Sequence, residues 1–197
     1  MDSLISVAYH SRGGNTRRLA EAVEAGSAEQ GARTHLVDVE QITDKDWAIL
    51  ARSDGIFFGS PTHIGGPSAG FVAFAEQTSR FQPSAAWADK LAAGFTTSAA
   101  MEGGKLGALQ FMLALATQHG MLWVGQALRA GWNTSKSSPA DLNRLGYRLG
   151  SVAQCNADEK PADMQESDLL TAAEHGRRMA RLTQKLHDEP TVAEGSR

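Results

Sequence analysis

The chain has 197 residues, 42% of them hydrophobic, a formal net charge of −3 and one cysteine. This length and apolar content favour one domain with a sizeable core, and the near balance of charge argues against a nucleic-acid-binding protein, which would carry a basic face. A single cysteine excludes an internal disulfide, no apolar run is long enough to span a membrane, and no leader pattern precedes the first strand, so we expect a cytoplasmic protein.

The first apolar run, residues 4–9, is followed by a turn of hydroxyl, glycine and amide residues and then directly by a helical pattern. The residues of this turn are Ser11, Arg12, Gly13, Gly14, Asn15 and Thr16. Their order predicts that backbone N–H groups and small hydroxyls meet at a helix N-terminus, which attracts phosphate. An ordinary strand-to-helix turn capped by Thr16 stays the alternative.

Other nucleotide-binding and phosphate-binding loops do not fit this turn. No lysine follows Gly14, so the P-loop pattern fails, and Gly13 and Gly14 have the wrong spacing for the G-x-G-x-x-G fingerprint. The sole cysteine, Cys155, lies far from the turn, which excludes a cysteine phosphatase loop, and we expect it to be incidental.

Strands and helices are predicted to alternate along the rest of the chain. The expected elements are, in order, a helix at 16–30, a strand at 34–39, a helix at 44–51, a strand at 55–59, a helix at 69–79, a strand at 91–96, a helix at 105–119, a strand at 121–124 and a helix at 167–187. Continuous apolar strands separated by helices predict a parallel sheet that is covered on both faces. We therefore expect an α/β, flavodoxin-like three-layer sandwich with a five-stranded parallel sheet of order 2-1-3-4-5.

The domain is expected to span residues 1–189, with an excursion at 126–161 after the fifth strand and a disordered tail at 190–197. The helix at 105–119 carries an unusually wide apolar stripe, and a subunit interface would cover it.

Two more loops follow strands of the predicted sheet, at residues 59–67 and 96–104, and both are rich in glycine, hydroxyl or small residues. Loops at the carboxyl ends of parallel strands meet at one crevice. His119 ends the long helix, which we expect to be aimed at this crevice.

The segments 9–16, 59–65, 95–98 and 119–121 together resemble the flavin mononucleotide (FMN)-binding, flavodoxin-like reductases, in particular the WrbA-like NAD(P)H:quinone oxidoreductases. The resemblance covers about residues 4–155, and Gly59-Ser60-Pro61-Thr62 is its most specific part. It implies FMN as cofactor, NADPH or NADH as electron donor, a quinone-like small molecule as acceptor and a homodimer or homotetramer.

The resemblance also implies the site residues. Phosphate binding falls to Ser11, Arg12, Gly13, Gly14, Asn15 and Thr16. Contacts with the flavin ring fall to Pro61, Thr62, His63, Ile64 and Gly65, and to Thr97, Ser98, Ala99, Ala100, Met101 and Glu102. His119 is expected to contact the ring or the pocket, and His119 and His63 are the candidate catalytic residues.

Simpler interpretations stay open for several of these side chains. Arg12 either contacts the phosphate, recruits the nicotinamide cofactor or is solvated on its turn, and His63 either faces substrate or is exposed to water. His119 is also explained as a histidine favoured by the dipole at a helix C-terminus. The remaining histidines share no ligand spacing, so no metal site is expected.

Two departures from the family pattern bear on the site. Gly13 stands where the family has a hydroxyl residue, and the loop 99–102 is poorer in glycine and threonine. Two functions besides the oxidoreductase stay open: a flavodoxin-type electron carrier that does not react with NAD(P)H, and a non-catalytic flavin-binding interaction protein.

Overall fold

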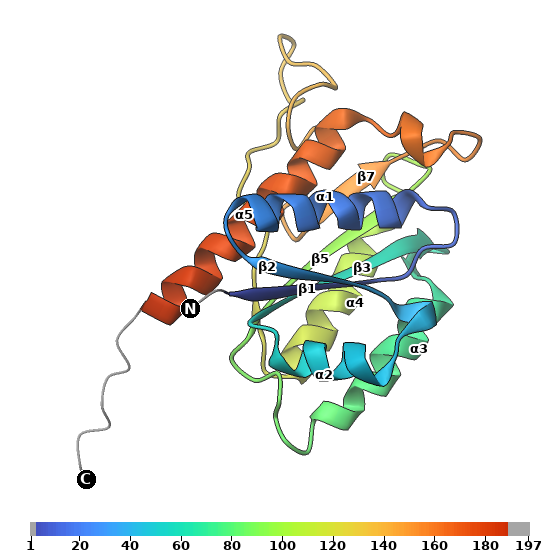
Figure 1. Ribbon diagram of the computed structural model, residues 1–197. Coiled ribbons are helices and arrows are strands. Elements are labelled where there is room, and N and C mark those ends of the chain that lie inside the picture. The colour runs from blue at the N-terminus through green and yellow to red at the C-terminus, as the bar shows by residue number, and fades with distance from the viewer. Residues whose placement is uncertain (1–2, 189–197) are drawn as a thin grey trace.

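The computed structural model of the protein describes residues 3–188 and shows a parallel β-sheet between two layers of helices (Figure 1). Its strands are β1 (Leu4–Tyr9), β2 (Arg33–Asp38), β3 (Gly55–His63), β4 (Gly66–Pro67), β5 (Leu91–Ser98), β6 (Leu122–Trp123) and β7 (Ser151–Gln154). The main path of the sheet has the order β2-β1-β3-β5-β6. This order confirms the flavodoxin-like α/β sandwich that the sequence predicts.

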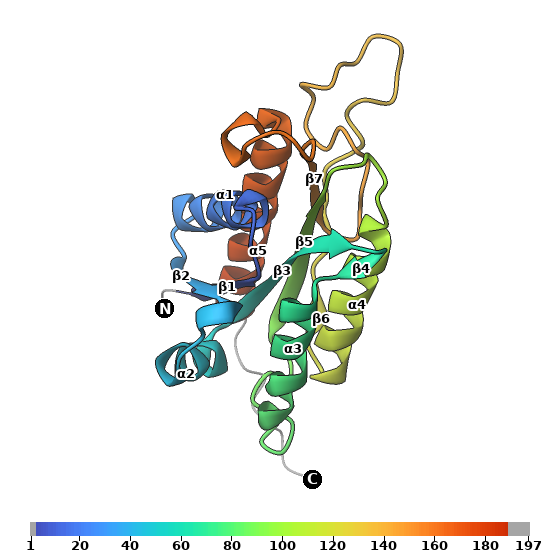
Figure 2. The same ribbon diagram turned by 90° about the vertical axis from the view of Figure 1, so that its right-hand side faces the viewer.

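The helices cover both faces of the sheet (Figure 2). They are α1 (Asn15–Glu29), α2 (Asp44–Arg52), α3 (Ala69–Gln77), α4 (Lys105–Gln118) and α5 (Glu166–Asp188). Buried residues of α1 and α5, such as Leu19 and Met179, pack with one face of the sheet, and those of α2, α3 and α4, such as Leu50, Phe71 and Leu109, pack with the other. Burial on both faces explains why the central strands read as continuous apolar runs.

The fifth position of the sheet is occupied by two short strands rather than by one. β6 pairs with Leu91 and Ala92 at the beginning of β5, whereas β7 pairs with residues 95–98 at its end. Residues 124–150 form an insertion between the two strands, and its middle part projects away from the sheet (Figure 2), whereas Leu145 and Leu149 pack against the core. The stretch 126–161, expected as an excursion after the fifth strand, therefore contains the second half of that strand position.

β3 is longer than its apolar run predicts. Ser60 and Pro61 continue the parallel pairing with β5, and Thr62 and His63 turn back as a hairpin with β4. The loop expected at 59–67 is thus largely strand and hairpin, which gives its side chains fixed directions.

Two further expectations concern the C-terminal tail and the membrane. The tail expected at 190–197 lies outside the described residues. Within residues 3–188, no helix combines the length and the apolar character that are needed to cross a bilayer.

Candidate functional site

The turn between β1 and α1 presents backbone donors at the carboxyl edge of the sheet. Gly14 precedes α1 with a φ of 88°, a left-handed conformation that favours glycine, and it supplies no side-chain cap. The N–H of Arg17 donates to Ser11 Oγ at 3.1 Å, but no described residue accepts a hydrogen bond from the N–H groups of Asn15 or Thr16. The first turn of α1 is therefore a ready site for an anion.

Two side chains extend this donor set into the pocket. Thr16 Oγ1 lies 3.1 Å from Thr97 Oγ1, so the start of α1 and the end of β5 meet through buried hydroxyls. Asn15 Oδ1 is buried without a hydrogen-bond partner in the described chain. Because the oxygen and nitrogen of an asparagine amide exchange by a simple flip, this position can offer either a donor or an acceptor to a ligand.

A pocket of about 300 Å³ opens at this edge. Its lining residues are Ser11, Arg12, Gly13, Asn15, Thr16, Pro61, Thr62, His63, Thr97, Ser98, Ala99, Cys155 and Ala157. The structure therefore brings together most of the residues that the resemblance implies. Among these described lining residues, Arg12 carries the one permanent charge and none has a carboxylate, which suits an anionic group.

Ile64 and Gly65, which were expected to contact the flavin ring, form a tight turn and do not line the pocket. Both residues have positive φ, 49° and 79°, and the Ile64 side chain is fully exposed. A β-branched residue in this conformation is strained, and such strain is often found at functional sites. The turn lies against α4, because a Cβ on Gly104 or Gly107 would come within 2.5 Å or 2.3 Å of Gly65 atoms.

The loop after β5 is held from two sides. Lys105 Nζ donates to Ser98 Oγ at 2.6 Å, to Ala100 O at 2.5 Å and to Met101 O at 3.1 Å. From the other side, Gln154 Nε2 donates to Ala99 O at 2.8 Å. These bonds fix Ser98 and Ala99 in the pocket wall, whereas Ala100, Met101 and Glu102 do not line it.

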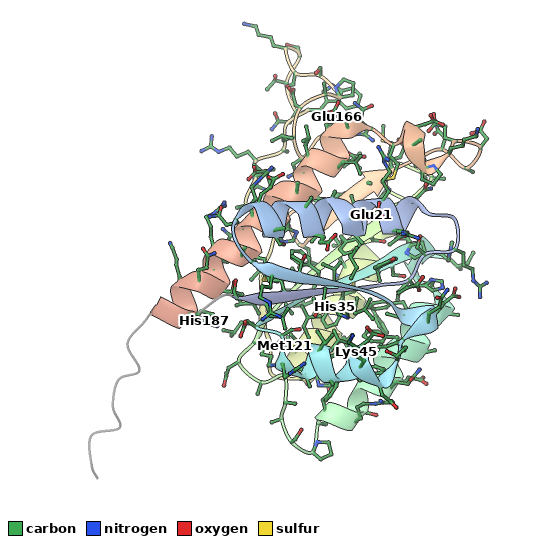
Figure 3. The ribbon with its side chains drawn as sticks, in the orientation of Figure 1. Glu21, His35, Lys45, Met121, Glu166 and His187 are labelled. Atoms are coloured by element: carbon green, nitrogen blue, oxygen red, sulfur yellow. The ribbon has the colours of Figure 1, made fainter. Side chains whose placement is uncertain are left out.

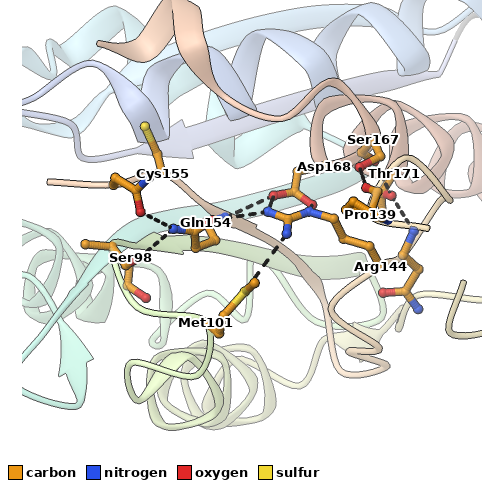
Figure 4. A network of polar contacts seen from close by, with 12 residues as sticks. Ser98, Met101, Pro139, Arg144, Gln154, Cys155, Ser167, Asp168 and Thr171 are labelled. Atoms are coloured by element: carbon orange, nitrogen blue, oxygen red, sulfur yellow. Dashed lines mark hydrogen bonds and ion pairs between the residues drawn. The ribbon is translucent and has the colours of Figure 1, made fainter. Parts of the chain in front are cut away.

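A buried ion pair fixes Gln154 in turn (Figure 4). Arg144 donates from Nε and Nη2 to the two carboxylate oxygens of Asp168, both at 2.8 Å, and Asp168 Oδ2 also accepts from the Gln154 N–H at 3.0 Å. Arg144 Nη1 lies 4.0 Å from Met101 Sδ. The insertion, α5 and the loop after β5 are thus tied into one polar network.

A second network, buried at His10 and Ser68 and exposed at Arg12 and Glu40, joins the first loop to the segments that follow β2 and β4. His10 Nδ1 lies 2.7 Å from Ser68 Oγ, and His10 Nε2 lies 2.9 Å from Glu40 Oε1. Arg12 Nε donates to the same carboxylate oxygen at 3.2 Å. The hydrogen bonds from His10 and then from Arg12 hold the pKa of Glu40 below its ordinary value, so the carboxylate stays charged and holds Arg12 at the pocket mouth.

The expectation that His119 faces the crevice is wrong. α4 runs antiparallel to β5, so its C-terminus lies where the strands begin: the N–H of Asp89 donates to Gly120 O, and the N–H of Leu122 donates to Lys90 O. Met121, two residues after His119, lies on that side of the molecule (Figure 3). His119 instead pairs with Thr78 Oγ1 at 2.8 Å and packs on Trp87, and burial lowers its pKa.

Three residues of this region were not predicted from the sequence. Cys155 and Ala157 line the pocket because they follow β7, a strand too short to be recognised. Burial, and then nearby carboxylates such as Glu159, raise the pKa of the Cys155 thiol, so the thiol stays protonated at neutral pH. The sequence indicates no more for Lys105 than the beginning of a helix, and its contacts in the structure show that it supports the pocket wall.

The comparisons with known proteins agree with this geometry. Residues 1–133 match the family model described as NADPH-dependent FMN reductase. Flavodoxin FldP of Pseudomonas aeruginosa is 39% identical, with 92% of this chain and 97% of that protein covered. An NAD(P)H dehydrogenase (quinone) of Archaeoglobus fulgidus is 30% identical, with 92% and 98% covered.

Among solved structures, a flavodoxin, WrbA-like protein from Agrobacterium tumefaciens superposes with a TM-score of 0.72 at 36% identity, over 93% of this chain and 99% of that one. The family description names FMN and NADPH, which confirms the cofactors that the resemblance implied. The chain belongs to the NADPH-dependent FMN reductase family and is of the flavodoxin-like, WrbA type.

Proposed function

We propose that the protein is an FMN-dependent oxidoreductase that passes electrons from NAD(P)H to a quinone-like small molecule. The single observation that carries this proposal is the pocket at the carboxyl edge, where unpartnered helix N–H groups and hydroxyls converge and no described lining residue has a carboxylate. The name of the Archaeoglobus relative supports the choice of quinone as acceptor.

The residues present fit the phosphate of FMN. The N–H groups of Asn15 and Thr16, the hydroxyls of Ser11 and Thr16 and, with its amide turned to present the nitrogen, the Asn15 side chain would hold a dianion at the positive end of α1. Gly13, which replaces a hydroxyl residue of the family pattern, faces open space, so backbone contacts there are unobstructed. Arg12 adds the only permanently charged side chain in the lining.

The walls beside this cradle would take the flavin ring. Pro61, Thr62 and His63 form one wall, and Thr97, Ser98 and Ala99 form another. Hydrogen bonds stiffen both walls, because Thr62 Oγ1 lies 2.7 Å from Thr96 Oγ1 and Thr96 Oγ1 donates to Ser60 O at 2.7 Å. The fully exposed Ile64 beside this mouth offers an apolar contact to a bound ring or substrate.

FMN, when bound, supplies the two-electron chemistry that links oxidation of NAD(P)H to reduction of a quinone to the hydroquinone. The protein's task is to bind and to orient. His63, exposed at the end of β3, is the residue that we propose to meet the substrate, since His119 lies at the opposite edge. Arg12, with its guanidinium anchored to Glu40 through Nε, is placed to meet a phosphate of the nicotinamide cofactor or of FMN.

An electron carrier without NAD(P)H chemistry is the second candidate. The Pseudomonas relative at 39% identity carries the name flavodoxin, which favours it. The formal net charge of −3 differs from the strongly acidic surface expected of a dedicated small carrier. We therefore keep the oxidoreductase as the leading proposal.

Flavin titration and stopped-flow mixing test the two candidates. We expect the apoprotein to quench FMN fluorescence on binding, and we expect anaerobic NADPH or NADH to bleach the bound flavin rapidly, with colour returning on addition of benzoquinone. Binding without bleaching would favour the carrier. An apoprotein that takes up no FMN would overturn the proposal and favour a non-catalytic interaction protein.

We also propose that the protein works as a homodimer or homotetramer in the cytoplasm. On α4, Leu106 is 46% exposed, and Phe111 and Leu115, which line a groove of about 370 Å³ between α3 and α4, are only partly buried. Sedimentation equilibrium of the wild type and of Leu106→Glu checks this: a monomeric wild type contradicts it, and a shift of the variant towards monomer supports it.

A further inference from the structure

A buried cation supports the wall of the candidate flavin pocket. Lys105, the first residue of α4, has no exposed surface, and its ammonium donates to Ser98 Oγ, Ala100 O and Met101 O. Ser98 itself lines the pocket. The charge therefore lies one hydrogen bond behind the pocket surface.

No carboxylate among residues 3–188 forms an ion pair with this ammonium, and its three acceptors are all neutral oxygens. The charged groups that face it from neighbouring elements are Glu102 of its own loop, Asp168 of α5 and Arg144 of the insertion. Asp168 already accepts hydrogen bonds from Nε and Nη2 of Arg144, and the Glu102 carboxylate accepts from the Gly104 N–H at 2.8 Å. The formal charges of Lys105, Arg144, Asp168 and Glu102 sum to zero, but the Lys105 ammonium lies directly behind the pocket wall and the positive end of α4 adds to its field.

We propose that Lys105 is a positioning residue that raises the reduction potential of bound FMN by favouring its reduced, anionic form. The proposal rests on the proposed function, because it requires FMN in this pocket. The oxidised ring is neutral and the reduced ring is an anion at neutral pH, so a nearby cation stabilises the two forms unequally. Only this difference in affinity can shift the redox equilibrium.

The environment of Lys105 leaves its side chain mostly protonated at neutral pH. Burial lowers the pKa of Lys105 to about 8, which still leaves most molecules protonated at pH 7. Its hydrogen bonds hold the ammonium in one place, so its field acts on the pocket without reorganisation.

Lys105→Met in the full-length protein tests the proposal, and Lys90→Met is the matched control. Lys90 is partly buried, whereas Lys105 is fully buried, but like Lys105 it donates to a backbone carbonyl, Ala51 O at 2.5 Å, and has a pKa lowered by burial. It precedes β5 at the opposite edge of the sheet, away from the pocket. The two variants thus remove similar groups from opposite ends of one strand.

The readout is the ratio of the dissociation constants for oxidised and reduced FMN at pH 7, together with the midpoint potential. We expect Lys105→Met to weaken binding of reduced FMN about tenfold more than binding of oxidised FMN, equivalent to a midpoint potential lower by about 30 mV for a two-electron couple. Lys90→Met is expected to keep the wild-type ratio. An unchanged ratio in Lys105→Met, even with weaker binding of both forms, would overturn the proposal, because Lys105 would then act only on the loop or on the phosphate.

Glu102→Gln gives a second, opposite test on an exposed loop residue. Removing this carboxylate leaves the charge of Lys105 less compensated, so the midpoint potential is expected to rise, whereas Gln keeps the acceptor for the Gly104 N–H. If Lys105→Met binds FMN too weakly to titrate, an unchanged or lower potential in Glu102→Gln overturns the proposal. Absence of FMN binding by the wild type would instead be the failure of the proposed function.

Discussion

At the scale of single residues, the site is made by groups that lack partners. Gly14 precedes α1 and offers no side-chain cap, so the N–H groups of Asn15 and Thr16 have no acceptor in the described chain. Most buried polar groups in proteins are paired, which makes an unpaired set at a helix N-terminus a strong indication of an anionic ligand.

Thr16→Val removes one hydroxyl from this set and keeps the side-chain volume. We expect FMN affinity to fall by roughly 10-fold to 100-fold, because a hydrogen bond to a charged group contributes about 1.5–3 kcal/mol. Fluorescence titration with FMN measures the change. Thr117→Val is the control, since the Thr117 hydroxyl donates to Ala114 O near the C-terminus of α4, away from the pocket. Equal affinities for Thr16→Val and the wild type would count against the phosphate assignment.

At the scale of elements, the hairpin β3–β4 and the N-terminus of α4 meet backbone to backbone. Gly65 approaches both Gly104 and Gly107 so closely that no side chain fits between them. This glycine contact therefore acts together with the pairing of Pro61 with Thr97 to hold the two walls of the pocket next to each other.

Gly107→Ala tests this contact. In an exposed helix the change would add up to about 1 kcal/mol of stability, but here the new Cβ would lie 2.3 Å from Gly65 O and displace the hairpin. We expect the free energy of unfolding to fall by about 1–3 kcal/mol and FMN to bind more weakly.

Gly176→Ala is the matched control for this prediction. Its Cβ would lie 2.1 Å from Val23 O, between α5 and α1 and outside the pocket lining. Thermal unfolding and FMN titration are measured for both variants. We expect both to lose stability and only Gly107→Ala to lose FMN affinity at a temperature where both are folded; a wild-type affinity in Gly107→Ala would show that the hairpin does not set the pocket.

The division of the fifth strand position is the other decisive feature at this scale. The insertion carries Arg144, which pairs with Asp168. Asp168 also accepts from the N–H of Gln154 in β7, and the Gln154 side chain donates to Ala99 O in the loop after β5. Replacing one partner of such a buried pair would leave the other charge buried without compensation, which is strongly destabilising. Both partners are therefore needed to hold the loop in one arrangement.

At the scale of the whole molecule, His175 holds the two halves of that strand position together. From α5 it reaches Val124 O, just after β6, at 2.9 Å and Ser151 Oγ, at the start of β7, at 3.0 Å. The neutral ring satisfies both contacts, with Nε2 donating to the carbonyl and Nδ1 accepting from the hydroxyl. Burial lowers the pKa of His175 from 6.5 to about 4.

This burial predicts an acid-dependent loss of stability. Between pH 6.5 and about 4 the unfolded chain binds a proton at this histidine and the folded chain does not, so the free energy of unfolding falls as the pH is lowered. The contribution is about 3 kcal/mol over that window. Urea unfolding of the wild type and of His175→Gln from pH 7 to pH 4.5 checks it. The variant is expected to be less stable at pH 7 but to lose less on acidification; parallel curves would contradict the assignment.

The sequence by itself determined the alternation of strands and helices and the turn before α1, because continuous apolar runs and a glycine-rich helix start are local patterns. The order of the strands was expected only because such an alternation fits the flavodoxin-like arrangement. The sequence also led to the loops that meet in the pocket, since carboxyl ends of parallel strands share one edge. Only the tertiary structure decided that the four residues of β7 complete the sheet, that His119 lies at the opposite edge and that Lys105 is buried behind Ser98. Each of these depends on contacts between segments far apart in the chain, and such contacts leave no periodic signal in the segments themselves.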